Sequence, residues 1–179
     1  MISGNEIIKR IKDGSIVIIP FDEKRVNPNS YNITLNNKLK VYTEDILDCK
    51  KDNSFKEVII PEEGIVLQPN ELYIGATNEY TETYGLVPCI DGRSSIGRLG
   101  ICIHVTAGFG DNGFKGVWTL EITVVKPVRI YPNIEIAQIY FQEIEGEKAE
   151  LYSGRYQNQK EAEVSRFYET RKINDFFLP

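Results

Sequence analysis

Short segments in which apolar and polar residues alternate make up most of this chain, and no other feature constrains its fold as strongly. Before them, Ser3, Glu6 and the apolar residues that follow at helical spacing predict one short amphipathic helix that ends at Gly14. The alternating segments predict strands at residues 16–21, 31–35, 38–42, 57–61, 71–77, 101–107, 117–125, 128–131 and 136–144. Many short strands after a single helix predict a mainly β protein, either a sandwich, a jelly roll or a barrel.

The composition is that of an ordinary globular protein. The chain has 179 residues, of which 41% are hydrophobic and 26% charged, as expected of one domain with one core. The first residues are too charged for a secretory signal, and no apolar run is long enough to span a membrane. The three cysteines are widely spaced, so we expect free thiols and a cytoplasmic protein without a membrane partner. We assign residues 1–166 to the domain and residues 167–179 to a C-terminal tail.

The net charge restricts the ligand. With 21 Lys and Arg against 26 Asp and Glu, the net charge is −5. Proteins that bind DNA or RNA normally carry a basic surface, so a nucleic acid polymer is excluded as a partner. A small anionic ligand is still allowed, because it needs only a few local cations.

The segment Asp91 to Gly100, DGRSSIGRLG, has the composition of an anion site. Its glycines let a ligand approach the backbone, while Arg93, Arg98 and the hydroxyls of Ser94 and Ser95 offer hydrogen-bond donors. A surface turn with solvated arginines is an equal alternative. The spacing does not match a Walker phosphate loop.

A second glycine-rich segment, residues 106–116, carries one acidic residue, Asp111. The simplest interpretation is that Asp111 hydrogen-bonds its own turn. The flanking Phe109 and Phe114 favour a ligand with a flat ring, such as a base or a sugar.

Glu121 interrupts an otherwise apolar strand. Alternation predicts Trp118 and Leu120 on one face and Thr119 and Glu121 on the other. A carboxyl group that is partly removed from water has a raised pKa, which suits a general base or acid. The alternative is a solvent-facing glutamate on an edge strand.

His104 is the only histidine, so a histidine-rich metal site cannot form. The His-x-Glu and Pro-Cys-x-x-Cys motifs of zinc nucleobase deaminases are missing, as is the GxSxG nucleophile motif. We therefore expect no zinc catalysis and interpret His104 as structural or as a hydrogen-bonding residue near a site.

Taken together, the string DGRSSIGRLGICIHVTAGFGDNGFKGVWTLE resembles the core signature of the dCTP deaminase family, which lies within the trimeric dUTPase superfamily. Supporting matches are IIPFD, NPNSYNITL, LQPNELYIGAT, IAQIYF and YSGRYQNQK. The resemblance implies a distorted jelly roll, or dUTPase-like β-barrel, that forms a homotrimer with active sites between subunits. It also implies zinc-independent hydrolysis of dCTP to dUTP and ammonia.

The resemblance assigns roles to individual residues. Glu121 would activate the water that attacks C4 of cytosine, while Ser94 and Arg98 would act at the phosphates and reaction centre, with the arginine supplied by a neighbouring subunit. Further nucleotide contacts would come from Arg93 and Ser95 at the phosphates, His104, Val105, Thr106 and Ala107 along the base, Phe114 under the deoxyribose, Gln138, and Tyr152, Arg155 and Gln159 in a segment that closes over the triphosphate. Magnesium would be carried by the triphosphate rather than by the protein.

Some family members continue from dUTP to dUMP and diphosphate. The dUMP is the precursor for thymidylate synthesis. The string TAGFGDNGF resembles these two-step members, and Asp111 would position the second water. The resemblance also makes dTTP a candidate inhibitor. The alternatives are a dUTPase without deaminase activity and a non-catalytic nucleotide-binding trimer. Two departures from the family pattern are Asn32, in place of an aspartate, and Gly110, in place of an isoleucine, which predicts a more flexible loop.

Overall fold

A computed structural model describes residues 1–104, 107–147 and 150–170. Helix α1 (Gly4–Lys12) begins where predicted, since the Ser3 side chain accepts a hydrogen bond from the backbone N–H of Glu6. It ends at Lys12, and Gly14 follows with a φ of +80° that few other residues adopt. The predicted N-terminal helix is confirmed.

Strands dominate the rest of the described chain, with three short helical turns among them. The turns are η1 (Glu23–Arg25), α2 (Ser94–Gly97) and η2 (Phe167–Glu169), and the strands are β1 (Ile16–Ile19), β2 (Tyr31–Tyr42), β3 (Phe55–Ile59), β4 (Ile65–Leu67), β5 (Tyr73–Thr77), β6 (Tyr80–Thr83), β7 (Leu86–Gly92), β8 (Ile101–Cys102), β9 (Lys115–Gly116), β10 (Thr119–Val124), β11 (Val128–Ile130) and β12 (Glu135–Glu143).

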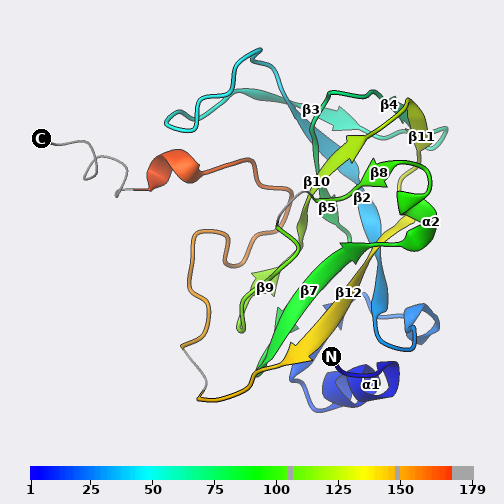
Figure 1. Ribbon diagram of the computed structural model, residues 1–179, viewed down its shortest axis with the longest axis vertical. Coiled ribbons are helices and arrows are strands. Elements are labelled where there is room, and N and C mark those ends of the chain that lie inside the picture. The colour runs from blue at the N-terminus through cyan, green and yellow to red at the C-terminus, as the bar shows by residue number, and fades with distance from the viewer. Residues whose placement is uncertain (105–106, 148–149, 171–179) are drawn as a thin grey trace, which may run out of the picture.

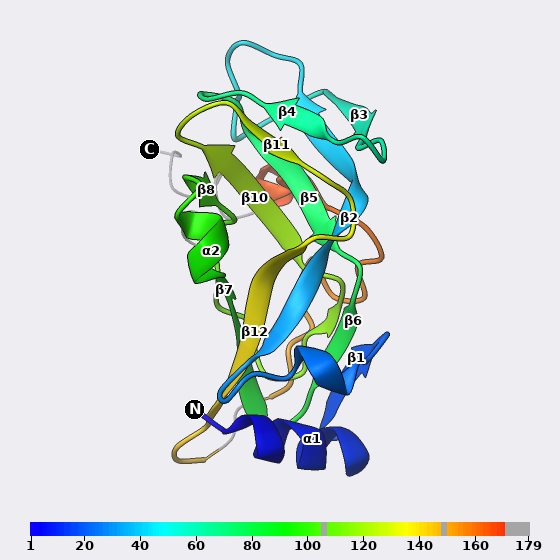
Figure 2. The same ribbon diagram turned by 90° about the vertical axis from the view of Figure 1, so that its right-hand side faces the viewer.

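A seven-stranded antiparallel sheet forms the body of the molecule. Its order is β7-β12-β2-β5-β10-β8, with β3 also paired to β2, and it curls strongly along its length (Figures 1 and 2). Two small sheets, β1-β6-β9 and β4-β11, lie beside it. The predicted mainly β, distorted jelly-roll or barrel architecture is confirmed.

Most predicted strand boundaries lie within two residues of the observed ones, and two differences are larger. Residues 31–35 and 38–42 form the single strand β2, which absorbs the break through a register shift between Leu35 and Leu39. The strand predicted at 101–107 ends at Cys102, because β8 pairs with β10 only at Cys102 and Ile101. The structure also adds β4, β6, β7 and β9, which carry weaker apolar alternation or are too short to show it.

The core lies between the curled sheet and its covering elements. Alternate residues of β10, including Leu120 and Ile122, are fully buried, as are Tyr31 and Phe141 of the same core. Burial of such side chains contributes about 1.5–3 kcal/mol each. The face of β10 opposite to this core is consequently free to line a site.

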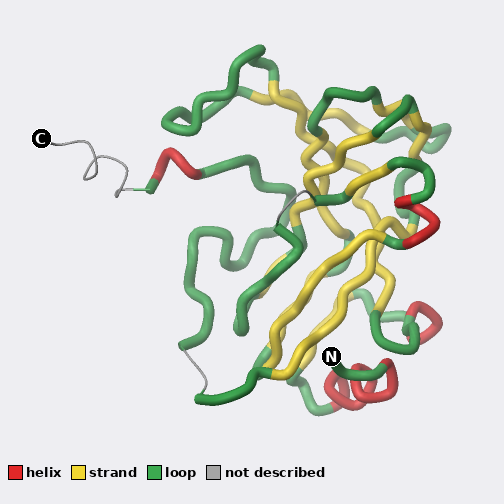
Figure 3. The backbone as a smooth tube through the Cα atoms, viewed as in Figure 1, coloured by secondary structure: helices red, strands yellow, loops and turns green. Residues whose placement is uncertain are grey.

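After β12 the chain returns across the molecule in an extended path without regular strands (Figure 3). We call residues 150–166 the C-terminal strap. It docks on β9 and β10 through a parallel bridge between Gly116 and Gln159 and a hydrogen bond from the Val117 N–H to the Gln159 carbonyl. Of the tail, residues 167–170 include η2, and residues 171–179 lie outside the described part. No helix in the described chain has the length and apolar character needed to cross a membrane.

Candidate functional site

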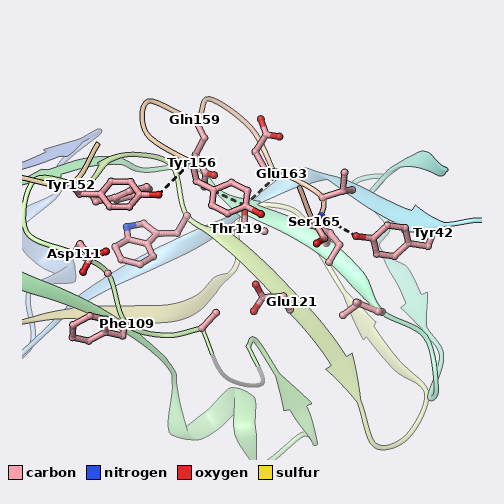
Figure 4. A pocket seen from close by; sticks show the side chains of 17 residues that line it. Tyr42, Phe109, Asp111, Thr119, Glu121, Tyr152, Tyr156, Gln159, Glu163 and Ser165 are labelled. Carbon is pink, nitrogen blue, oxygen red and sulfur yellow. Dashed lines mark hydrogen bonds between the residues drawn. The ribbon is translucent and has the colours of Figure 1, made fainter. Parts of the chain in front are cut away.

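A cavity of about 450 Å³ lies between β10, the strap and residues 107–114, which we call the glycine-rich loop. Figure 4 shows carboxylates, hydroxyls and aromatic rings facing it from these three elements. Its walls are formed by Tyr42, Leu72, Ile74, Ala107, Phe109, Gly110, Asp111, Phe114, Trp118, Thr119, Glu121, Tyr152, Tyr156, Gln159, Glu163, Val164 and Ser165.

Glu121 points into this cavity from the middle of β10 (Figure 4). Its backbone pairs with Ile74 of β5, and β8 pairs farther along the same strand, so β10 is not an edge strand. Burial raises the pKa of the Glu121 carboxyl group, and the electrostatic influence of nearby His104 offsets only part of this increase. The desolvated interpretation of Glu121 is therefore the correct one.

His104 lies near Glu121 and is held by the backbone. Its Nε2 lies 3.1 Å from the carbonyl oxygen of Ile90, so this nitrogen donates and Nδ1 is left as the acceptor. Nδ1 is buried and has no hydrogen-bond partner among the described residues. Ala107 lines the cavity, whereas Val105 and Thr106 lie outside the described residues.

Asp111 faces the same cavity from the glycine-rich loop, where it is exposed. The loop is fixed to β7 by hydrogen bonds from the Ile90 N–H to the Gly108 carbonyl and from the Gly110 N–H to the Pro88 carbonyl, at 2.7 and 2.9 Å. A side chain at Gly110 would collide with the ring of Trp118. The glycine thus provides close packing, and the predicted gain of flexibility does not describe its role.

Aromatic rings form one end of the cavity. Phe114 is 8% exposed and packs against Trp118 and Tyr152, with ring centroids 5.1 and 6.0 Å apart. The Trp118 indole N–H donates to the hydroxyl of Thr81 at 3.0 Å. Because these rings support one another, Phe114 presents a rigid apolar surface to whatever enters.

The strap, to which Tyr152 belongs, forms a further wall of the cavity. The Gln159 amide donates to the Val117 carbonyl and to the Thr119 hydroxyl, so its N–H groups hold the strap. The Gln157 amide similarly donates to the carbonyls of Gly113 and Tyr152, both at 2.8 Å. Tyr152 and Gln159 therefore line the same cavity as Glu121.

Arg155 does not line the Glu121 cavity. It lines a neighbouring cavity of about 340 Å³ that the strap encloses with Lys160 and Arg166. Its guanidinium donates to the Thr170 hydroxyl at 2.9 Å and lies 3.5 Å from the Glu169 carboxylate.

The residues of segment 91–100 also lie apart from Glu121. Ser94, Ser95 and Arg98 are exposed on or beside α2, which follows β7 and lies next to β8 (Figure 2). None of them lines the Glu121 cavity within the described part of the chain. Gln138 is likewise separate, since its side chain accepts from the Ser30 hydroxyl at 2.9 Å and donates to the Gly92 carbonyl at 3.4 Å.

Several lining residues were not predicted from the sequence, among them Tyr42, Tyr156 and Glu163. Tyr42 accepts a hydrogen bond from the Ser165 N–H at 3.0 Å, and the Glu163 N–H donates to the Thr119 hydroxyl at 3.1 Å. Tyr156 lies next to Arg155 and close to Gln159 in the sequence. Because both of these residues were predicted to contact the nucleotide, this proximity was the sequence signal that could have identified Tyr156. No sequence signal identified Tyr42, because an aromatic residue at the end of a strand is usually part of the core.

The cavity contains no cage for a metal ion that its own side chains could complete. Among residues 1–104, 107–147 and 150–170, no group of three His, Cys, Asp or Glu side chains is placed to hold one.

Comparisons with known proteins agree with one another. Residues 1–144 match the family model described as dCTP deaminase-like. A Clostridium acetobutylicum protein named "dCTP deaminase, dUMP-forming" is 59% identical over 163 residues, which cover 89% of this chain and 94% of that protein. A protein of the same name from Leptospira biflexa is 52% identical over 168 residues, covering 94% and 96%. The solved 2'-deoxycytidine 5'-triphosphate deaminase from Agrobacterium tumefaciens shares the fold, with a TM-score of 0.63 at 20% identity over 79% of this chain and 48% of that chain.

Proposed function

The chain belongs to the dCTP deaminase-like family, and from this premise we propose that it converts dCTP to dUTP and ammonia and then dUTP to dUMP and diphosphate. The observation that carries the proposal is the half-buried carboxyl group of Glu121, which faces a cavity lined by aromatic rings and a second carboxylate. The names of the relatives, at 52–59% identity, agree with both steps.

Glu121 performs the acid–base chemistry of the first step. Its carboxylate takes a proton from water as the oxygen attacks C4 of cytosine and passes this proton to N3. It then takes the proton of the new 4-hydroxyl group and delivers it to the amino group, which leaves as ammonia while the C4–O double bond of uracil forms. A pKa raised by burial suits both roles, because it makes the carboxylate a stronger base than an exposed glutamate. His104 lies beside this reaction and is held in one tautomer by the Ile90 carbonyl.

Asp111 serves the second step. Its exposed carboxylate faces the cavity without using a hydrogen-bond partner among the described residues, so it is free to orient a water toward the α-phosphate. Attack of that water at the α-phosphorus breaks its bond to the oxygen that bridges the α- and β-phosphates, so that dUTP gives dUMP and diphosphate.

The nucleotide lies with its deoxyribose on Phe114, whose rigid ring leaves no room for a 2′-hydroxyl group. The base lies toward Glu121 and residues 104–107, and Tyr152 and Gln159 close over it. Magnesium enters with the triphosphate. Gln138 and Arg155 act near the nucleotide but outside the Glu121 cavity. dTTP carries a pyrimidine and the same triphosphate, which makes it a candidate inhibitor.

We further propose that the working unit is a homotrimer in which Ser94, Ser95 and Arg98 complete the site of a neighbouring subunit. Within one chain these exposed residues do not reach the Glu121 cavity. Their free donors suit phosphates that lie across a subunit boundary.

Hybrid trimers test this arrangement. Glu121→Gln and Arg98→Ala subunits, each inactive alone, are unfolded, mixed in equal amounts and refolded together. Random association restores both residues at about a quarter of the sites if they come from different chains. Continued inactivity of the mixture, with wild-type subunits recovering under the same protocol, would show that both act in one chain.

The reaction itself is tested with dCTP and Mg²⁺, following ammonia and nucleotide products. We expect ammonia and dUMP in equal amounts. Unchanged dCTP together with hydrolysis of added dUTP would identify a dUTPase without deaminase activity. Binding of both nucleotides without turnover would identify a non-catalytic nucleotide-binding trimer.

A further inference from the structure

The two arginines that flank α2 have opposite surroundings. Arg93 places its Nη1 2.7 Å from the Glu135 carboxylate and 3.2 Å from the Glu135 carbonyl oxygen. Arg98 has no side-chain partner in the described part of the chain and is exposed. Of the two, only Arg98 is therefore free to meet phosphate with its whole guanidinium group.

Glu135, at the start of β12, is itself fixed by two further side chains. The Asn32 amide N–H donates to the Glu135 carboxylate at 2.9 Å, and the Nε of Arg25 lies 4.0 Å from it. The Asn32 oxygen accepts from the Asn27 amide at 2.7 Å, which orients Asn32 as a donor toward Glu135.

The chain of contacts ends in the protein interior. Arg25 lies 2.6 Å from the carboxylate of Glu79, whose side chain is 0% exposed. Glu79 also accepts hydrogen bonds from the backbone N–H and hydroxyl of Thr34, at 2.8 and 2.9 Å. Glu79, Arg25, Glu135 and Arg93 thus alternate in charge, and a buried carboxylate with several hydrogen bonds anchors the series.

Arg93 also controls the backbone of the turn. It is the residue before the first turn of α2, and its carbonyl oxygen accepts from the N–H groups of Ile96 and Gly97 at 3.0 and 2.9 Å. A fixed Arg93 side chain consequently fixes the orientation in which Ser94 and Ser95 are presented.

We propose that Glu135 is a positioning residue for the turn 93–98 and acts through Arg93, with Asn32 required as the hydrogen-bond donor that holds Glu135. The proposal rests on the proposed function, in which this turn contacts the triphosphate. It separates two roles within one motif: Arg93 orients the turn, and Arg98 contacts the nucleotide.

A double-mutant cycle tests whether Glu135 acts through Arg93. Glu135→Gln, Arg93→Ala and their combination are compared with wild type in dCTP turnover and in calorimetric binding of α,β-imido-dUTP, at a temperature where circular dichroism shows every variant folded. Glu135→Gln should raise KM and Kd about fivefold with kcat within about twofold, and should have no further effect once Arg93 is alanine. The matched control is Glu143→Gln, an exposed carboxylate at the other end of β12, which should change neither constant.

Substitution of Asn32 provides the second arm. Asn32→Asp turns an acceptor toward Glu135 and should weaken nucleotide binding about fivefold or more, since two carboxylates then face each other. In the Glu135→Gln background Asn32→Asp should weaken binding no further, because no second carboxylate then faces the introduced aspartate.

Additive effects of Glu135→Gln and Arg93→Ala, a loss of kcat in place of an increase in KM, or further weakening by Asn32→Asp in the Glu135→Gln background would each overturn the proposal. A wild-type protein that neither turns over dCTP nor binds α,β-imido-dUTP would instead refute the proposed function.

Discussion

Glu121 and Asp111 face the same cavity from two regions that are built in different ways. Glu121 belongs to β10, where pairing with β5 and the buried neighbours Leu120 and Ile122 dictate its direction. Asp111 belongs to the glycine-rich loop, whose position depends on backbone hydrogen bonds to β7 and on the fit of Gly110 against Trp118. One carboxylate is set by sheet register, and the other by close packing of a loop.

The different surroundings of Glu121 and Asp111 explain how one cavity can serve two reactions. Burial raises the pKa of Glu121 and suits it to carry a proton, whereas Asp111 is exposed and suits the orientation of water. If each carboxylate serves one step, the two activities should be separable by substitution.

The largest expected effect is that of Glu121→Gln, which keeps the shape of the side chain and removes its proton transfer. Deamination of dCTP should fall by about 10³-fold or more, while hydrolysis of dUTP to dUMP falls far less. Ammonia release and dUMP formation from added dUTP measure the two steps. An equal loss of both would mean that the two carboxylates are not divided between the reactions.

Asp111→Asn should have the complementary effect. Diphosphate release from dUTP should fall about 10²-fold because the amide orients water poorly, and dUTP should accumulate from dCTP with ammonia release nearly unchanged. Chromatography of the nucleotides provides the measurement, with deamination as the internal control. Retained dUMP formation would remove Asp111 from the second step.

A smaller effect is expected from Gly110→Ala, which probes how the loop is positioned. The added methyl group must displace Trp118 or the loop, so dUMP formation should fall about tenfold and deamination by less. Gly97→Ala, where a methyl group meets no atom within 4 Å, is the steric control for stability. Equal rates for wild type and Gly110→Ala would contradict the packing role of this glycine.

The smallest effect concerns stability. Because the pKa of Glu121 is raised in the folded state, the folded protein binds this proton more tightly than the unfolded chain does. The contribution is favourable at low pH and is lost as pH rises from the ordinary glutamate pKa, about 4.3, through the raised value. Glu121→Gln should therefore increase the free energy of unfolding at pH 7 by up to about 1 kcal/mol and change it little near pH 4. Urea denaturation at both pH values checks this, and equal destabilisation at both would contradict it.

The sheet was predictable where its pattern repeats. Alternation in residues 117–125 correctly predicted that Trp118 and Leu120 are buried and that Glu121 lies on the opposite face. It could not predict that residues 31–42 form one strand, because the register shift is set by partners in β5 and not by β2 itself. Short strands such as β9 are defined only by the strands with which they pair.

The site was predictable in part for the same reason. Local motifs and family resemblance brought Glu121, Asp111, Phe114, Tyr152 and Gln159 to attention, and the structure gathers them around one cavity. The pairing of Arg93 with Glu135 was not visible, since the two residues are far apart in sequence and meet only through the sheet. Tyr42 and Glu163 enter the cavity because the strap returns there, which no local pattern encodes.

The position of Trp118 makes its fluorescence a probe of the site. Trp118 is the only tryptophan in the chain, and it lies at the cavity between Phe114 and Gly110. Intrinsic fluorescence excited at the red edge of the aromatic band consequently arises from this one position. Nucleotide entry can then be followed in the native protein, in real time and without a label.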